Sequence, residues 1–216
     1  MNKRPKTSKT LNFMEMSKGG SKWMTVIIVV VILVVVAVIA IVAFGNHATA
    51  PTSAQNGTHQ AAATSYTSTA DGFSMDFPET PTVTSKSFTS PSAGSISETD
   101  YTYVSSANGK GIVYMVIVFH YPAAYRFSDN YLTGALQMFN TVINAKYPGT
   151  TVSDQTQSQF LGGSAISATI VVPFMGTPTP GNVLITTKGQ NTYVVSAYGL
   201  SQSDYNSFIG SFTFAQ

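Results

Sequence analysis

Cysteine is absent from this chain of 216 residues. Its absence excludes disulfide bonds, thiolate metal sites, a cysteine nucleophile and an anchor attached to a lipid-modified cysteine. A globular domain in this chain must therefore be held together by its buried core. The C-terminal part supplies about 150 residues, which is long enough to bury such a core without covalent cross-links.

Histidine is also scarce, and His120 alone lies outside the polar segment that holds His47 and His59. A histidine-rich metal site is therefore excluded. The acidic residues are scattered singly, and the sequence contains neither a calcium-binding loop nor a phosphate-binding glycine loop. We predict no metal, no cofactor and no catalytic residue. An envelope hydrolase that uses His120 is the enzymatic alternative, although no Gly-x-Ser-x-Gly motif accompanies this histidine.

Charge is missing from one long run, the 21 residues from Met24 to Phe44, in which Val and Ile dominate. As a helix this run measures about 31 Å, which matches the hydrocarbon thickness of a bilayer. Within lipid, a helix satisfies its own backbone hydrogen bonds. We therefore expect one transmembrane helix over residues 23–44, with Trp23 at the interface and the lipid bilayer as its partner.

The charges on either side of this segment differ in sign. Six Lys or Arg residues and one Glu precede it, for a net charge of +5, whereas the residues after it carry −3. Positive flanks remain in the cytoplasm, so the pattern predicts a single-pass plasma-membrane protein with a cytoplasmic N-terminus and an extracytoplasmic C-terminal domain. The negative outer domain argues against nucleic acid as a partner.

Two alternatives to an uncleaved signal anchor remain at this stage. A cleaved signal peptide would use Ala48-Thr49-Ala50, but the apolar run is longer than usual for one and Pro51 should hinder cleavage. A type IV pilin would be processed after Gly19-Gly20, but the acidic residue typical of that family is absent. We expect the uncleaved anchor.

Four segments follow from these features. They are a basic cytoplasmic tail (1–22), the transmembrane helix (23–44), a flexible stalk rich in Ala, Thr and Ser (45–70) and an extracytoplasmic domain (71–216). The stalk contains Asn56-Gly57-Thr58, a weak match to an N-glycosylation acceptor.

Strand patterns open the outer domain. Residues 72–78 and 82–89 read as short strands, and 97–105 leads through the turn pair Asn108-Gly109 into 111–119. Both faces of that last strand are apolar, so it should be central and covered on both sides.

A helix is predicted next, with Ser128 as its N-cap, Asp129 in its first turn and Pro148-Gly149 at its end. Residues 160–173, 183–188 and 192–198 read as strands, and 175–182 as a hairpin loop. A short helix should start near Ser203. The order indicates an α+β domain in which an antiparallel β-sheet is sandwiched between helices.

Three short motifs give this domain a family resemblance. They are Gly72-Phe73-Ser74-Met75-Asp76-Phe77-Pro78 with Pro81, then Phe160 to Ala165, and finally Asp204 to Phe214, especially Phe208-Ile209-Gly210-Ser211-Phe212. In these motifs and in the order of its elements, the chain resembles the PsbP-like family over residues 72–214. The resemblance implies an antiparallel sheet between helices and a non-enzymatic accessory or assembly role. It implies no functional residue, because the matched positions are core and turn residues.

The segment after the central strand is the candidate ligand or partner surface. Tyrosine and arginine favour interfaces, since one offers a broad face with a polar tip and the other a forked donor. The candidate residues are His120, Tyr121, Tyr125, Arg126, Asp129 and Tyr131. We expect a non-enzymatic binding or assembly role in the cell envelope, with an envelope protein or cell-wall ligand as partner. A purely structural anchor of a larger complex is the other alternative, and it predicts a broad apolar patch.

Overall fold

The computed structural model describes residues 63–107, 110–174 and 176–215. The predicted transmembrane helix over 23–44 lies outside these residues, as does the Asn108-Gly109 turn. No helix within the described ranges is long and apolar enough to cross a bilayer.

The elements are β1 (Thr64–Ser68), β2 (Phe73–Phe77), β3 (Thr82–Ser90), β4 (Gly94–Ala107), β5 (Lys110–His120), α2 (Tyr131–Lys146), β6 (Thr151–Phe160), β7 (Gly163–Phe174), β8 (Thr177–Lys188), β9 (Asn191–Tyr198), α3 (Gln202–Gly210) and β10 (Thr213–Phe214).

Seven strands form the main sheet in the order β3-β4-β5-β9-β8-β7-β6, with antiparallel pairing throughout. Its third strand, β5, confirms the prediction of a central strand covered on both sides. Val116 and Val118 are fully buried on one face, and Phe119 is buried on the other. The predicted β4–β5 hairpin is also confirmed, since Ala107 pairs with Lys110.

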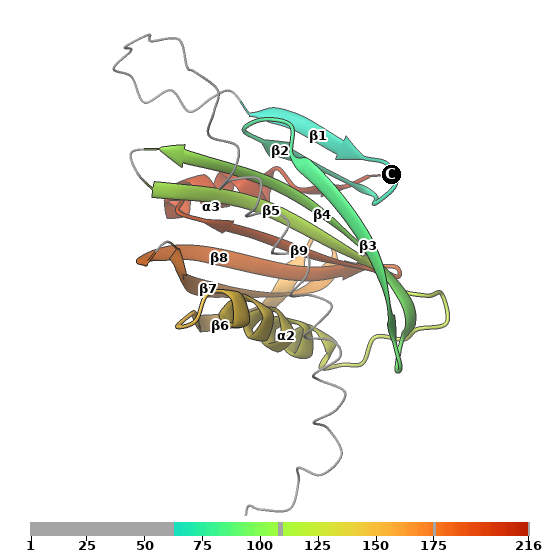
Figure 1. The fold of residues 1–216 in the computed structure, drawn as a ribbon. Helices are drawn as coiled ribbons and strands as arrows, with labels where there is room; N and C mark the ends of the chain where they lie inside the picture. Colours follow the sequence, from blue (N-terminus) through green and yellow to red (C-terminus); the bar gives the residue numbers. More distant parts are fainter. Residues whose placement is uncertain (1–62, 108–109, 175, 216) are drawn as a thin grey trace, which may run out of the picture.

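The arrangement of an antiparallel sheet sandwiched between helices is wrong. Helix α2 covers one face of the main sheet, but the other face is covered by α3 together with a second sheet, β1-β2-β10 (Figure 1). This sheet was not predicted, because β1 is polar and lies in the range assigned to the stalk, and β10 has two residues. Strand β2 lies between them and pairs with both β1 and β10.

Each face of the main sheet carries one buried apolar cluster. One contains residues of α2, such as Leu136 and Phe139, against Ile170 and Ile185 of the main sheet. The other lies between the sheets and is rich in aromatic rings. In it Phe73 stacks on Phe212 with ring centres 5.6 Å apart. Tight packing of apolar surface on both faces fixes the sheet as the middle layer.

Helix α2 begins later than the sequence analysis placed it. Its N-cap is Asn130, and Ser128 donates a hydrogen bond from its hydroxyl to the Asn130 side chain instead of capping the helix. Asp129 therefore lies outside the first turn. The helix ends at Lys146, directly before Tyr147 and the predicted Pro148-Gly149 stop, because proline cannot continue it.

The hairpins after α2 differ from prediction in two places. Strand β6 was not predicted, because its exposed side chains are mostly polar and give no apolar alternation. The hairpin loop predicted over 175–182 is wrong, since β8 begins at Thr177 and its residues Pro178 and Pro180 pair with β7. The β6–β7 turn places Leu161 at φ 50° and Gly162 at φ 80°, the backbone of a tight two-residue turn.

Candidate functional site

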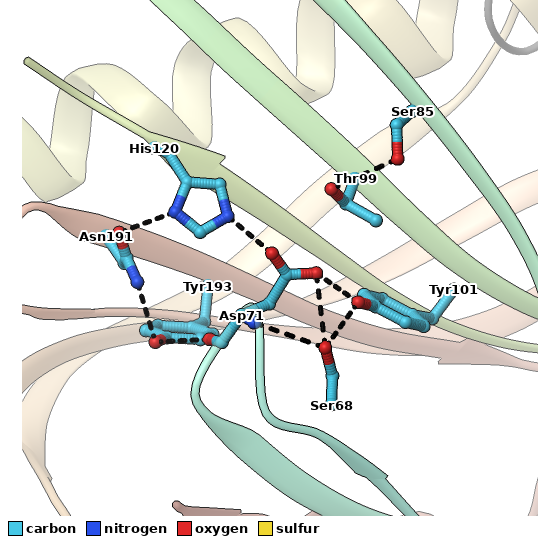
Figure 2. Close-up of polar contacts among 8 residues, drawn as sticks. All are labelled: Ser68, Asp71, Ser85, Thr99, Tyr101, His120, Asn191 and Tyr193. Atoms are coloured by element: carbon cyan, nitrogen blue, oxygen red, sulfur yellow. Dashed lines mark hydrogen bonds and ion pairs between the residues drawn. The ribbon is translucent and has the colours of Figure 1, made fainter.

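A buried carboxylate connects the two sheets at one end of the domain. Asp71 lies in the turn between β1 and β2, and its side chain reaches the last residue of β5 (Figure 2). Nε2 of His120 lies 2.6 Å from Oδ1 of Asp71, and the hydroxyl of Tyr101 donates to Oδ2. Ser68 donates to the same oxygen at 3.4 Å. A carboxylate that is 6% exposed is thus surrounded by three donors.

The second ring nitrogen of His120 is also engaged. Nδ1 lies 2.9 Å from Oδ1 of Asn191, and Nδ2 of Asn191 donates to the hydroxyl of Tyr193 at 3.2 Å. That hydroxyl donates to the backbone oxygen of Asp71 at 2.9 Å. Both ring nitrogens are therefore paired with side chains of the domain, Asp71 and Asn191.

The order of these groups differs from that of a hydrolytic triad. A triad places the histidine between the nucleophile and the acid. Here Asp71 lies between Ser68 and His120, and Ser68 bonds to Asp71 and to Tyr101. Burial raises the pKa of Tyr101, and its hydrogen bond to Asp71 adds to the rise. The arrangement is suited to joining two sheets.

A second buried polar group lies where β3 pairs with β4. Nζ of Lys86 lies 2.8 Å from Oε1 of Glu98, and Asp100 is the next residue on the same face of β4. Glu98 and Asp100 are 2% and 5% exposed. Burial, followed by the neighbouring charge of Glu98, raises the pKa of Asp100 to about 8. One lysine faces two carboxyl groups, and the proton retained by Asp100 reduces their repulsion.

An aromatic cluster forms from the segment after β5, on the side of the main sheet that carries α2. Tyr121 stacks on Tyr125 with ring centres 4.7 Å apart, and Phe127 lies edge-on to both. The Phe127 and Tyr131 rings are 4.5 Å apart. We call Tyr121, Tyr125, Phe127 and Tyr131 the aromatic loop cluster.

Hydrogen bonds hold the aromatic loop cluster on the sheet. The hydroxyl of Tyr131 donates to that of Tyr121 at 2.8 Å and lies 2.7 Å from Oγ1 of Thr192. Burial raises the pKa of Tyr121 and of Tyr131. Nη1 of Arg126 donates to the backbone oxygens of Ala123 and Tyr125. Hydrogen bonds and ring contacts within the loop therefore hold it in one conformation. Its four rings are half-buried, whereas Arg126 is exposed.

The six residues of the predicted surface do not form one surface. His120 points toward the small sheet, whereas the tyrosines lie on the opposite face of the main sheet. Asp129 is exposed beside the start of α2. Phe127, which lies in the same segment, was not predicted. Asp71, in the β1–β2 turn, and Asn191, the first residue of β9, were not predicted either, because no sequence pattern around them indicates a shared network.

Comparisons with known proteins give two structural similarities. The chain is similar to the solution structure of cyanobacterial PsbP from Synechocystis sp. PCC 6803, with a TM-score of 0.48, 14% identity and coverage of 76% of this chain and 99% of that one. It is also similar to a protein of unknown function from Pseudomonas aeruginosa described as a putative regulator, with a TM-score of 0.31, 12% identity and coverage of 66% and 85%. No family model and no curated protein matches the chain. Neither similarity assigns a function.

Replacing Asp100 by Asn should change how stability depends on pH. The unfolded chain ionises Asp100 at its ordinary pKa of 3.8, whereas the folded chain keeps the proton up to about 8. The contribution of this group to stability is therefore largest at acid pH and falls as the pH rises through that window. The free energy of unfolding of Asp100→Asn, relative to that of the natural chain, should increase by at least about 2 kcal/mol from acid to mildly alkaline pH.

Urea denaturation followed by circular dichroism at a series of pH values measures this difference. Asp129→Asn is the matched control, because it makes the same chemical change at an exposed position. A pH-independent difference for Asp100→Asn would contradict the assignment of a proton to Asp100.

Proposed function

We propose that this chain is a single-pass membrane protein whose C-terminal domain is a non-enzymatic binding or assembly module outside the plasma membrane. The uncharged run from Met24 to Phe44, with basic residues before it, supports the membrane location. The proposed partner is an envelope protein or a cell-wall ligand. The observation that carries the binding role is the aromatic loop cluster, defined above by its four rings.

The aromatic loop cluster has the chemistry of a binding surface. Its half-buried rings offer apolar area at little cost in conformational entropy, since packing and hydrogen bonds already fix them. Arg126 and Asp129 are exposed beside the rings and supply charged groups for a polar rim.

The position of the cluster also fits a tethered domain. The chain enters the domain at Thr64, and β1 then runs about 17 Å to the end at which Asp71 meets His120. The aromatic loop starts from that same end, directly after β5. In the proposed setting the cluster therefore points away from the point where the tether joins, toward partners that lie beyond the membrane surface.

The alternatives have less support. A hydrolase that uses His120 requires a nucleophile beside one ring nitrogen, and the two nitrogens instead contact Asp71 and Asn191. A purely structural anchor requires a broad apolar patch. Among the described residues, the exposed large apolar side chains are Val83 and Leu161. They belong to opposite edges of the main sheet.

Introduced cysteines test the proposed topology, because the natural chain contains none. Ser203→Cys, on the exposed face of α3, should react with a membrane-impermeant maleimide in right-side-out vesicles. Ser8→Cys, in the basic tail, should react only after the vesicles are opened with detergent. The opposite pattern would contradict the orientation, and labelling of both before opening would contradict the membrane anchor.

Photo-crosslinking tests the binding role of the aromatic loop cluster. A photoreactive benzoyl-phenylalanine replaces exposed Arg126 in the full chain, and irradiation of native membranes should give a discrete adduct. The same probe in place of Thr141, which is exposed on α2, is the control and should give none. The Arg126 adduct should fall at least about tenfold when Tyr125→Ala is added, since Tyr125 supplies one face of the stacked pair. Equal adducts at both probe positions, or an adduct that survives Tyr125→Ala, would contradict the proposal.

A further inference from the structure

A separate pocket lies on the face of the main sheet opposite α2, between α3 and the strands β6, β7 and β8. The small sheet and α3 cover only part of this face, so outward-facing side chains of β7 and β8 remain accessible beside α3. The pocket is an open depression of about 290 Å³, just below the range typical of small-molecule sites. It shares no lining residue with the aromatic loop cluster.

Neutral hydrogen-bonding side chains form about half of the wall of this pocket. Nδ2 of Asn182 lies 3.5 Å from Oε1 of Gln202, whose Nε2 donates to Oδ1 of Asn206 at 2.9 Å. Each carboxamide offers two donors and two acceptor positions, so this row retains capacity for a ligand. Ser167 and Thr169 add hydroxyl groups on the neighbouring strand.

The pocket also contains apolar surface and little charge. Leu184 of β8, Ile209 of α3 and Phe160 of β6 contribute apolar atoms. Asp154 is the single charged residue among the described residues that line it, and no Lys or Arg is among them. An anionic ligand such as a phosphate would find no counter-charge there. The lining therefore matches a neutral ligand that has both polar edges and apolar faces.

An extended polypeptide fits the same place less well. Peptides that bind beside an outer strand add to its backbone ladder, and β6 is the free edge here. The ladder of β6 is irregular, because its register shifts between Ser153 and Thr156 and Asp154 adopts φ 52°. Such a bulge interrupts the row of backbone groups that a new strand would need.

We propose that this pocket binds a neutral oligosaccharide. A sugar ring carries hydroxyl groups that both donate and accept around its edge, and C–H groups on its faces. The carboxamide side chains hydrogen-bond to the sugar hydroxyl groups, or to an acetamido group. The apolar residues contact the C–H groups on the faces of the sugar ring. This site goes beyond the partner binding proposed for the aromatic loop cluster and does not depend on it.

Isothermal titration calorimetry on the full chain tests this proposal. The chain is held in a detergent without a sugar headgroup, since glycosidic detergents would compete. The probes are the tetramers of N-acetylglucosamine and of β-1,4-linked glucose. At least one should bind with one site per chain, and Gln202→Ala/Asn206→Ala should weaken that binding about tenfold or more, because two side-chain hydrogen bonds are lost.

The matched control is Ser203→Ala/Ser207→Ala, which changes two exposed residues of α3 outside the pocket and should bind as the natural chain does. Both pairs of substitutions place Ala, which favours helix, at exposed positions of α3, so the helix itself is not expected to unfold. Absence of binding by both tetramers would overturn the proposal. So would unchanged affinity in Gln202→Ala/Asn206→Ala, or binding of an extended Thr–Val peptide in place of the sugars.

Discussion

The carboxylate of Asp71 is the constraint on which the arrangement of the two sheets depends. The interface between them is otherwise apolar and aromatic, so a buried charge there must be matched by donors. His120 and Tyr101 supply hydrogen bonds from two strands of the main sheet, and Ser68 supplies one from β1. In the observed arrangement the turn between β1 and β2 brings Asp71 to all three partners, one of which is the last residue of β5.

The positions of the aromatic loop cluster and of the pocket depend on how the small sheet and the end of β5 are held. Because His120 is held by Asp71 and Asn191, the loop that follows it starts from a defined point, and its four aromatic rings then pack on the opposite face of the sheet. The small sheet occupies only part of its own face. The remaining part, beside α3, is where the pocket forms. The surface on the α2 side of the main sheet is thus rich in aromatic rings, and the surface beside α3 is rich in neutral amides.

The local pattern of apolar residues and helix-stopping residues in the sequence predicted the elements in which that pattern is strong. The two apolar faces of β5 and the stop of α2 before Pro148 were correct, because burial on both faces and the geometry of proline act within a few residues. Strands β1, β6 and β10 were missed. The first two are polar and give no apolar alternation, and β10 is a two-residue strand whose partner, β2, is distant in sequence. The candidate surface was continuous in sequence, but alternation along β5 sends His120 to one face while the tyrosines occupy the other. The pocket combines β6, β7, β8 and α3, and no local pattern predicts their meeting.

Native-state hydrogen exchange of the full chain tests the central role of Asp71 most directly. If Asp71 locks the small sheet onto the main sheet, the amides of β2 should exchange through the same global unfolding as those of β5, with equal free energies of opening. In Asp71→Asn the β2 amides should exchange much faster than those of β5, because the small sheet then opens by itself. Equal protection of β2 and β5 in the variant would contradict the account, and so would rapid exchange of β2 in the natural chain.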